Sequence, residues 1–282
     1  MIQKHADALP IIDVLPLFPA VNKQLIMLLK SLTTEEWHQP TVLPGRMVKD
    51  LASHLLDGSL RRLSVCRDSY HVRAPNIDSY EGLVKHIQEL NKAWIEATQR
   101  LSPLILISFL KLSEQWLYDY FKALNPHDKA AFSVAWAGEV ESQNWFDIAR
   151  EYTEKWHHQM QIRLAVHKPG INTREFFYPV IDIFMRGLPH AYKNTQAGVH
   201  CGIEIYIKGD GGGRWFLEKT DTQWQLVKNL KKAPEATIEM TDDSAWQLFT
   251  DSMSRDVAAQ SIVIRGNKMV GEVLLNMRTV MR

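Results

Sequence analysis

Cysteine is scarce in this chain, and its scarcity excludes two kinds of scaffold. The 282 residues include 2 cysteines, Cys66 and Cys201. They lie far apart and outside any C-x-x-C pattern, so neither a disulfide framework nor a zinc-thiolate cluster is predicted. A reducing compartment is therefore expected.

An excess of charge and long hydrophobic runs are also missing. The 33 basic and 32 acidic residues leave a formal net charge of +1, which provides no surplus of positive charge for a phosphate backbone, so no nucleic-acid partner is expected. The longest apolar stretch, LSPLILISFL, is too short to cross a bilayer. The N-terminus, MIQKHADALP, lacks the basic, apolar and small-residue succession of a secretory signal. We expect no membrane association and a cytoplasmic location.

What is present is the composition of an ordinary globular protein. Hydrophobic residues make up 45% of the chain and charged residues 23%. The length exceeds that of one typical domain, and no internal repeat or low-complexity tract accounts for the excess. Two domains are therefore expected, whereas the oligomeric state is not specified by the sequence.

The first half of the chain has the apolar spacing of helices. An early helix carries LIMLLKSL and ends before Thr33, where Thr33 and Glu36 form a capping box. The loop QPTVLPG follows. Further helices are predicted over residues 46–67, 80–101, 103–124 and 142–167. Few glycines interrupt these segments, so the sequence predicts a helical bundle.

The pattern changes after Lys168-Pro169-Gly170, where a helix stop marks the predicted boundary between domains 1–168 and 169–282. One more helix is predicted over residues 173–193. Apolar and polar residues then alternate in GIEIYIKGD, GRWFLEKT, QWQLVK and ATIEM, which predicts an antiparallel meander. The glycines of KGDGGGRW are interpreted as a hairpin turn, because a strand and not a helix follows them. The second domain is therefore predicted to be α+β.

Three residues in the predicted bundle have the chemistry of metal ligands. In EYTEKWHHQMQIR, Glu154 and His158 lie four residues apart, so a helix projects both from one face with Cβ atoms roughly 6 Å apart. His54 lies mid-helix in DLASHLLDG among leucines, where an unpaired imidazole is costly to bury. A shared divalent ion would engage all three side chains.

Two imidazoles and one carboxylate match the ligand set of catalytic zinc sites, in which a fourth position stays open for water or substrate. Nickel, cobalt or iron would also fit these donors, so zinc is the first candidate among several. The spacing alone leaves two other interpretations open. Glu154 and His158 could form a solvated ion pair, and His54 could be a core histidine with a protein partner.

Two segments carry a resemblance to a known family. The stretch LTTEEWHQPTVLPGRMVKDLASHLLDG, together with residues 150–163, resembles the mycothiol-dependent maleylpyruvate isomerase family. In this family a proline-glycine loop and a helix lead to the first metal histidine, which corresponds to His54, and a later helix supplies Glu154 and His158. The resemblance implies a DinB-like up-and-down four-helix bundle followed by a sterol-carrier-like α+β domain.

The resemblance also implies an activity. The metal would bind the sulfur of a low-molecular-weight thiol, similar to mycothiol or bacillithiol, lower its pKa and present a thiolate to a small electrophilic substrate. The protein would then be a transferase or an isomerase. Metal-assisted hydrolysis, with water at the open position, is one alternative. A non-enzymatic carrier of apolar ligands with a structural metal is another.

Two residues depart from the family pattern. Arg46 stands where the family usually has tryptophan, which weakens only a packing inference. Gln161 stands where an aspartate commonly follows the second histidine. A glutamine at this position would hold the imidazole without adding negative charge.

Several polar residues near these segments are secondary candidates. Arg265, at the end of a predicted strand in IVIRGN, is a candidate for contact with a substrate anion. Arg150 is expected to pair with Glu154 on the helix, or to meet such an anion. Asp50 and Asp57 could support the metal ligands but are more typical of surface or capping carboxylates. The neighbour of His158, His157, is expected to point away from the ion.

Overall fold

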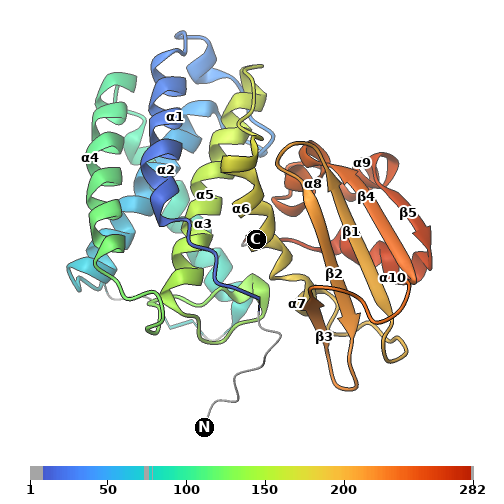
Figure 1. Ribbon diagram of the computed structural model, residues 1–282. Helices are drawn as coiled ribbons and strands as arrows, with labels where there is room; N and C mark the ends of the chain where they lie inside the picture. The colour runs from blue at the N-terminus through green and yellow to red at the C-terminus, as the bar shows by residue number, and fades with distance from the viewer. Residues whose placement is uncertain (1–8, 73–75, 78, 281–282) are drawn as a thin grey trace. The chain divides into compact units, whose positions relative to one another are not determined.

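The computed structural model describes residues 9–72, 76–77 and 79–280. The chain forms two compact units, shown with their labelled elements in Figure 1. The helical unit comprises residues 14–131 and 154–170, and the sheet unit comprises residues 9–13, 132–153 and 171–280. Among the described residues, no helix is long and apolar enough to cross a membrane. A domain boundary at residue 168 stays a prediction.

The predicted helices of the first half are all present. They are α1 (Phe18–Lys30), α2 (Val48–Arg62), α3 (Tyr80–Thr98), α4 (Pro103–Lys122) and α5 (Asn144–Ala165). A π-helical turn, η3 (Leu63–Arg67), extends α2 to the predicted end of this segment. The apolar faces of these helices form the core of the helical unit, where leucines such as Leu25, Leu51 and Leu110 are almost fully buried.

Local hydrogen bonds explain where these helices begin. The predicted capping box is present: the Thr33 N–H donates to Glu36 Oε2 (2.8 Å) and the Glu36 N–H donates to Thr33 Oγ1 (3.2 Å). It opens the short turn η2 (Glu36–His38). Ser102 caps α4 by accepting from the Ile105 N–H, and Pro103 occupies the first helical position, where no N–H is needed.

The helix predicted over residues 173–193 is two helices. They are α6 (Arg174–Met185) and α7 (Leu188–Ala191). Pro189 has no N–H to continue the α-helical ladder, so the chain turns at Arg186 and Gly187 and starts again. The single long helix of the prediction is therefore wrong at this point.

The sheet unit contains five strands in the order β3-β2-β1-β4-β5. Their bounds are β1 (Gly202–Lys208), β2 (Gly213–Lys219), β3 (Trp224–Val227), β4 (Ala236–Thr241) and β5 (Val263–Gly266). Strands β1 and β2 are antiparallel and pair Ile207 with Gly213, so the glycine-rich segment is the predicted hairpin turn. Isoleucines 203, 205 and 207 are fully buried and alternate with half-buried residues.

The predicted antiparallel meander is correct for β1 to β3 and wrong for β4, which is parallel to β1. After β3 the chain returns to the end of the sheet at which β1 begins, where the Glu235 N–H donates to Gly202 O (2.8 Å). Strand β4 thus starts beside the start of β1 and runs in the same direction. Alternation identifies a strand but not the end of the sheet at which it begins.

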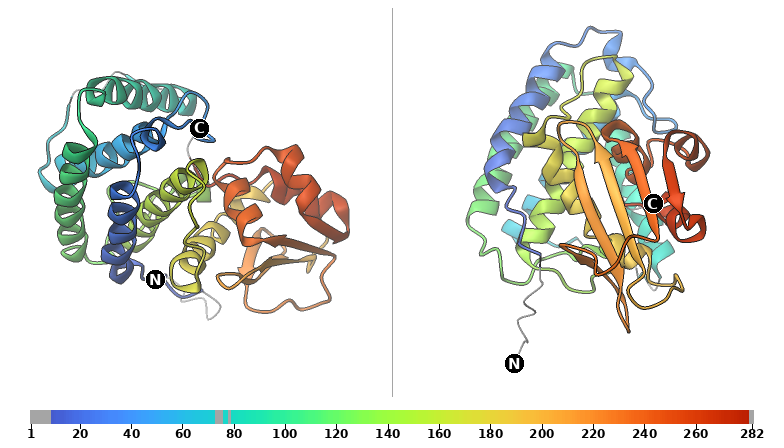
Figure 2. Two further views of the ribbon diagram at one scale, coloured as in Figure 1. Left: turned by 90° about the horizontal axis from the view of Figure 1, so that it is seen from above. Right: turned by 45° about the vertical axis from the view of Figure 1, so that its right-hand side comes forward.

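Short helices complete the sheet unit. They are α8 (Asp242–Phe249), α9 (Arg255–Ser261), α10 (Lys268–Gly271) and the turn η5 (Glu272–Asn276). Helices α8 and α10 contact β4, and the left view of Figure 2 shows the orange and red helices on one side of the strands. The predicted fold class, a helical N-terminal region with a C-terminal α+β domain, is confirmed.

Candidate metal centre

Helix α2 presents His54 at the edge of the core. Leu51, Ala52, Leu55 and Leu56 around it are buried, whereas His54 itself is partly exposed. Its ring makes no hydrogen bond with any residue in the described part of the chain. A partly buried imidazole without a hydrogen-bond partner among the described residues is suited to a ligand from outside the chain.

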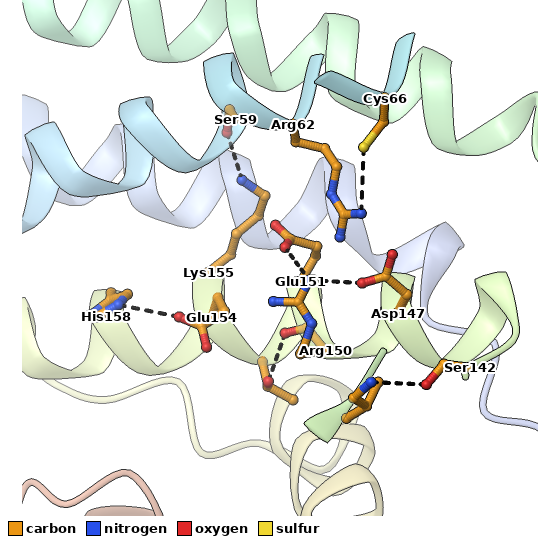
Figure 3. Close-up of polar contacts among 12 residues, drawn as sticks. Ser59, Arg62, Cys66, Ser142, Asp147, Arg150, Glu151, Glu154, Lys155 and His158 are labelled. Carbon is orange, nitrogen blue, oxygen red and sulfur yellow. Dashed lines mark hydrogen bonds and ion pairs between the residues drawn. The ribbon is translucent and has the colours of Figure 1, made fainter. Parts of the chain in front are cut away.

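Helix α5 presents the other two side chains on one face. His158 Nε2 lies 3.4 Å from Glu154 Oε2, and Figure 3 shows the two side chains directed toward each other. The His158 side chain is 10% exposed and that of Glu154 29% exposed. This is the arrangement that the four-residue spacing predicts.

The tertiary structure brings His54 to this pair. One ligand atom from each of His54, Glu154 and His158 lies within 4.8 Å of the other two. The rings of His54 and His158 meet edge-on, with centroids 4.9 Å apart and an interplanar angle of 84°. Three donors this close together, two imidazole nitrogens and one carboxylate oxygen, fit a divalent ion such as zinc.

Gln161 orients one of the histidines. Its amide oxygen lies 2.8 Å from His158 Nδ1. An amide oxygen only accepts, so Nδ1 carries the proton of the neutral ring and the lone pair of Nε2 is directed toward Glu154. Gln161 thus performs the orienting task that the sequence suggested, without a second negative charge beside the ligands.

Burial keeps the other histidine neutral. Desolvation, helped by the nearby His158 ring and opposed by Glu154, lowers the pKa of His54 to about 3. At neutral pH the His54 ring is therefore uncharged and can donate a lone pair.

Asp50 and Asp57 have structural roles on α2. Asp50 accepts from the Met47 N–H (2.9 Å) at the helix start and from Gln99 Nε2 (3.0 Å). Asp57 lies 3.0 Å from Arg61 Nε, and burial raises the pKa of its carboxyl group. The capping interpretation of Asp50 fits these contacts.

His157 lies closer to the site than the sequence suggested. Its Nε2 is 4.0 Å from Glu154 Oε2, and its ring centroid is 4.1 Å from that of His158. The group of three convergent donors does not include it. A tilt of adjacent rings toward one carboxylate cannot be read from helical spacing.

Arg150 contacts two carboxylates of its own helix. Arg150 Nη2 lies 2.7 Å from Asp147 and 2.9 Å from Glu151, and its pairing with Glu154 stays a prediction. Figure 3 shows this group on α5. Several acids on one helix lie within reach of the same guanidinium. The spacing in the sequence does not decide which of them the guanidinium contacts.

Arg265 lies on β5, as predicted. Its side chain is 63% exposed, and its Nη1 lies 3.3 Å from Glu239 Oε2 on the neighbouring strand. Lys208 contacts the same carboxylate from β1.

Three buried polar residues were missed in the sequence. Ser59, Glu114 and Lys155 contact one another in the core of the helical unit. One signal was available, because Glu114 falls in the apolar stripe of α4 between Leu110 and Leu117. A charged residue at such a position needs a buried partner.

Comparisons with known proteins agree with this architecture. The family described as "Mycothiol maleylpyruvate isomerase N-terminal domain" matches residues 18–163. No curated protein matches the chain. Two crystal structures of the mycothiol-dependent maleylpyruvate isomerase, one of them a histidine-to-alanine mutant, have a similar fold: each is 10% identical, with a TM-score of 0.54, covering 91% of this chain and 93% of theirs.

A third similar structure is the solution structure of the sterol carrier protein domain 2 of Helicoverpa armigera. It is 18% identical, with a TM-score of 0.28, and the match covers 35% of this chain and 83% of that one. Since the family match spans more than half of the 282 residues and includes His54, Glu154 and His158, the chain belongs to the mycothiol maleylpyruvate isomerase N-terminal domain family.

Proposed function

We propose that this protein is a metal-dependent enzyme that uses a low-molecular-weight thiol to transfer or isomerise a small electrophilic substrate. The observation that carries the proposal is the convergence of His54, Glu154 and His158, whose donor atoms lie within 4.8 Å of one another. Zinc is the first candidate, and nickel, cobalt or iron would also suit the donors. Three protein ligands leave a coordination position for a ligand from solution.

The protein residues have distinct roles in this proposal. His54, Glu154 and His158 would hold the ion, and Gln161 holds His158 through Nδ1. A bound divalent ion would lower the pKa of a thiol and favour its reactive thiolate. The leucines around His54 limit the access of water on that side of the site.

An external thiol is favoured by the state of Cys201 and by family membership. Cys201 is 1% exposed, and burial together with the nearby Glu235 raises the pKa of its thiol to about 12, which is unsuited to a nucleophile. The two similar crystal structures are of a mycothiol-dependent enzyme. A mycothiol- or bacillithiol-like cofactor therefore has the strongest support.

The decisive experiment is elemental analysis of the purified wild type beside His54→Ala and His158→Ala. We expect stoichiometric metal in the wild type and its loss in both variants, because two ligands do not retain an ion that three hold. His127→Ala is the control: it removes an exposed imidazole of the helical unit that is not one of the three convergent donors. Metal-free wild type, or full retention in both ligand variants, would refute the metal site.

Calorimetry with candidate thiols then tests the reaction class. Binding of a thiol to the metal-loaded protein, and not to His54→Ala, is expected. Hydrolysis of an activated ester without any thiol would favour the hydrolase. Co-purifying lipid whose affinity survives chelation would favour the carrier.

Arg265 is proposed to contact an anionic group of the substrate. Its exposed guanidinium can bind a carboxylate in two parallel hydrogen bonds. Arg265→Gln should weaken the binding of a carboxylate-bearing substrate about tenfold or more, as for the loss of a charge-assisted hydrogen bond. Stability should change by less than about 1 kcal/mol, because the ion pair is exposed. Lys208→Gln is the control, since it removes another exposed cation from Glu239; equal effects on substrate binding would count against Arg265.

A further inference from the structure

A second polar cluster joins three helices inside the helical unit. Lys155 Nζ on α5 lies 2.6 Å from Glu114 Oε1 on α4. Ser59 Oγ on α2 donates to the same oxygen (2.7 Å), and Lys155 Nζ donates to Ser59 Oγ (3.1 Å). Figure 3 shows the contact between Lys155 and Ser59. Glu114 and Lys155 are each 4% exposed and Ser59 is 1% exposed, so solvent does not share these bonds.

Stability does not explain this network. A buried ion pair loses the hydration of both charges, and apolar side chains of similar volume often stabilise a core equally well. Glu114 Oε2 is buried and has no hydrogen-bond partner among the described residues, which makes a further unfavourable contribution to the stability of the fold. A network that is neutral or costly for stability is better explained by what its directional bonds hold in place.

The network lies on the two helices that carry the metal ligands. Lys155 directly follows Glu154 on α5, and Ser59 lies little more than one turn after His54 on α2. Apolar contacts between α2 and α5 would tolerate small sliding or rotation. The hydrogen bonds that Glu114 accepts from Ser59 and Lys155 restrict both motions, because a hydrogen bond weakens steeply when it is misaligned.

We propose that Ser59, Glu114 and Lys155 form a positioning network that fixes α2 against α5, so that His54 meets Glu154 and His158 before any ion binds. This inference rests on the proposed function, because the network would position the three proposed metal ligands. A functional site needs its groups held within about 0.5 Å, which requires such supporting contacts.

The main test is the double variant Glu114→Leu/Lys155→Met, which replaces both charges with apolar side chains. We expect a thermal midpoint equal to or above that of the wild type. Zinc affinity, measured by competition with a chromogenic chelator, should fall about tenfold or more, as for other residues that support metal ligands. Wild-type zinc affinity in a folded double variant would overturn the proposal.

A milder pair of variants covers the case in which the double variant does not fold. Ser59→Ala removes one hydroxyl of the network, and Ser113→Ala removes an equally buried hydroxyl on α4 that donates only to Leu110 O. We expect about a threefold or larger loss of zinc affinity in Ser59→Ala and none in Ser113→Ala. Equal behaviour of the two variants would refute the network's role.

A readout without metal separates this inference from the proposed function. The edge-on contact of the His54 and His158 rings should give their ring protons distinctive NMR shifts in chelator-treated protein. We expect Ser59→Ala to alter these shifts and Ser113→Ala to leave them unchanged. A wild type that takes up no zinc would refute the metal site only. Unaltered histidine shifts in Ser59→Ala would refute the positioning network only.

Discussion

The helical unit contains two polar clusters on the same helices, and they satisfy their groups in different ways. In the positioning network, Lys155 and Glu114 cancel each other's charge at 2.6 Å and are 4% exposed. In the ligand cluster, a carboxylate faces two imidazoles, and Glu154 and His54 remain partly exposed. In the first cluster a positive and a negative charge meet, whereas the second brings together the lone pairs of two imidazoles and one carboxylate.

This difference distinguishes a structural polar cluster from a binding site. Both clusters bring donors and acceptors from distant segments within a few ångströms of each other. Only the ligand cluster presents convergent electron pairs, with His158 oriented by Gln161 and the pKa of His54 lowered to about 3 by burial. A cation would complete it, and the partial exposure of Glu154 and His54 gives water access to it.

The largest expected effect tests whether the buried charges of Glu114 and Lys155 depend on each other. Lys155→Met would leave Glu114 as an uncompensated buried carboxylate, so we expect the free energy of unfolding to fall by about 3–5 kcal/mol. Urea denaturation measures it. The control is Lys92→Met, whose ammonium lies 3.9 Å from Glu96 and is 73% exposed; it should change stability by less than about 1 kcal/mol. Similar losses of unfolding free energy in the two variants would contradict the distinction between a buried and a solvated ion pair.

A smaller effect is expected where the ligand cluster depends on a supporting bond. Gln161→Leu would remove the acceptor of His158 Nδ1, and zinc affinity should fall about 10–100-fold. Gln159→Leu is the matched control, because Gln159 is a fully buried glutamine on the same helix that donates to Val21 O. Its replacement should leave zinc affinity unchanged. Chelator competition compares the two variants, and equal affinities would show that His158 needs no orienting partner.

The smallest expected effect is the contribution of His54 to the pH dependence of the unfolding free energy of the metal-free protein. Unfolded His54 takes up a proton below about pH 6.5, whereas in the folded state the pKa is about 3. The stability that the neutral His54 ring contributes is therefore fully present above about pH 6.5 and is lost as the pH falls toward 3. Between pH 6.5 and 5.5 the loss should reach about 1 kcal/mol.

Chemical denaturation at several pH values measures this contribution. We expect the slope between pH 6.5 and 5.5 to become shallower in His54→Gln and to persist in His127→Gln, which changes an exposed histidine. An unchanged slope in His54→Gln would mean that the folded ring titrates normally and that the ligand cluster is not desolvated.

Much of the fold could be predicted from the sequence because helices and caps are local. The apolar period of α1 to α5 and the capping box of Thr33 and Glu36 require only neighbouring residues. The four-residue spacing of Glu154 and His158 likewise determines that the pair shares one helix face. His54 could be joined to that pair by the need of a buried imidazole for a partner and by the resemblance to a family, because no local rule connects α2 with α5.

The tertiary structure decided the rest. The parallel pairing of β4 with β1, the contacts of Arg150 with Asp147 and Glu151, and the meeting of Ser59, Glu114 and Lys155 all depend on which segments become neighbours. Periodicity records which face of an element is apolar, since burial acts on every residue of that face. Which partner covers that face, and which polar group meets which, depends on contacts between residues far apart in the chain.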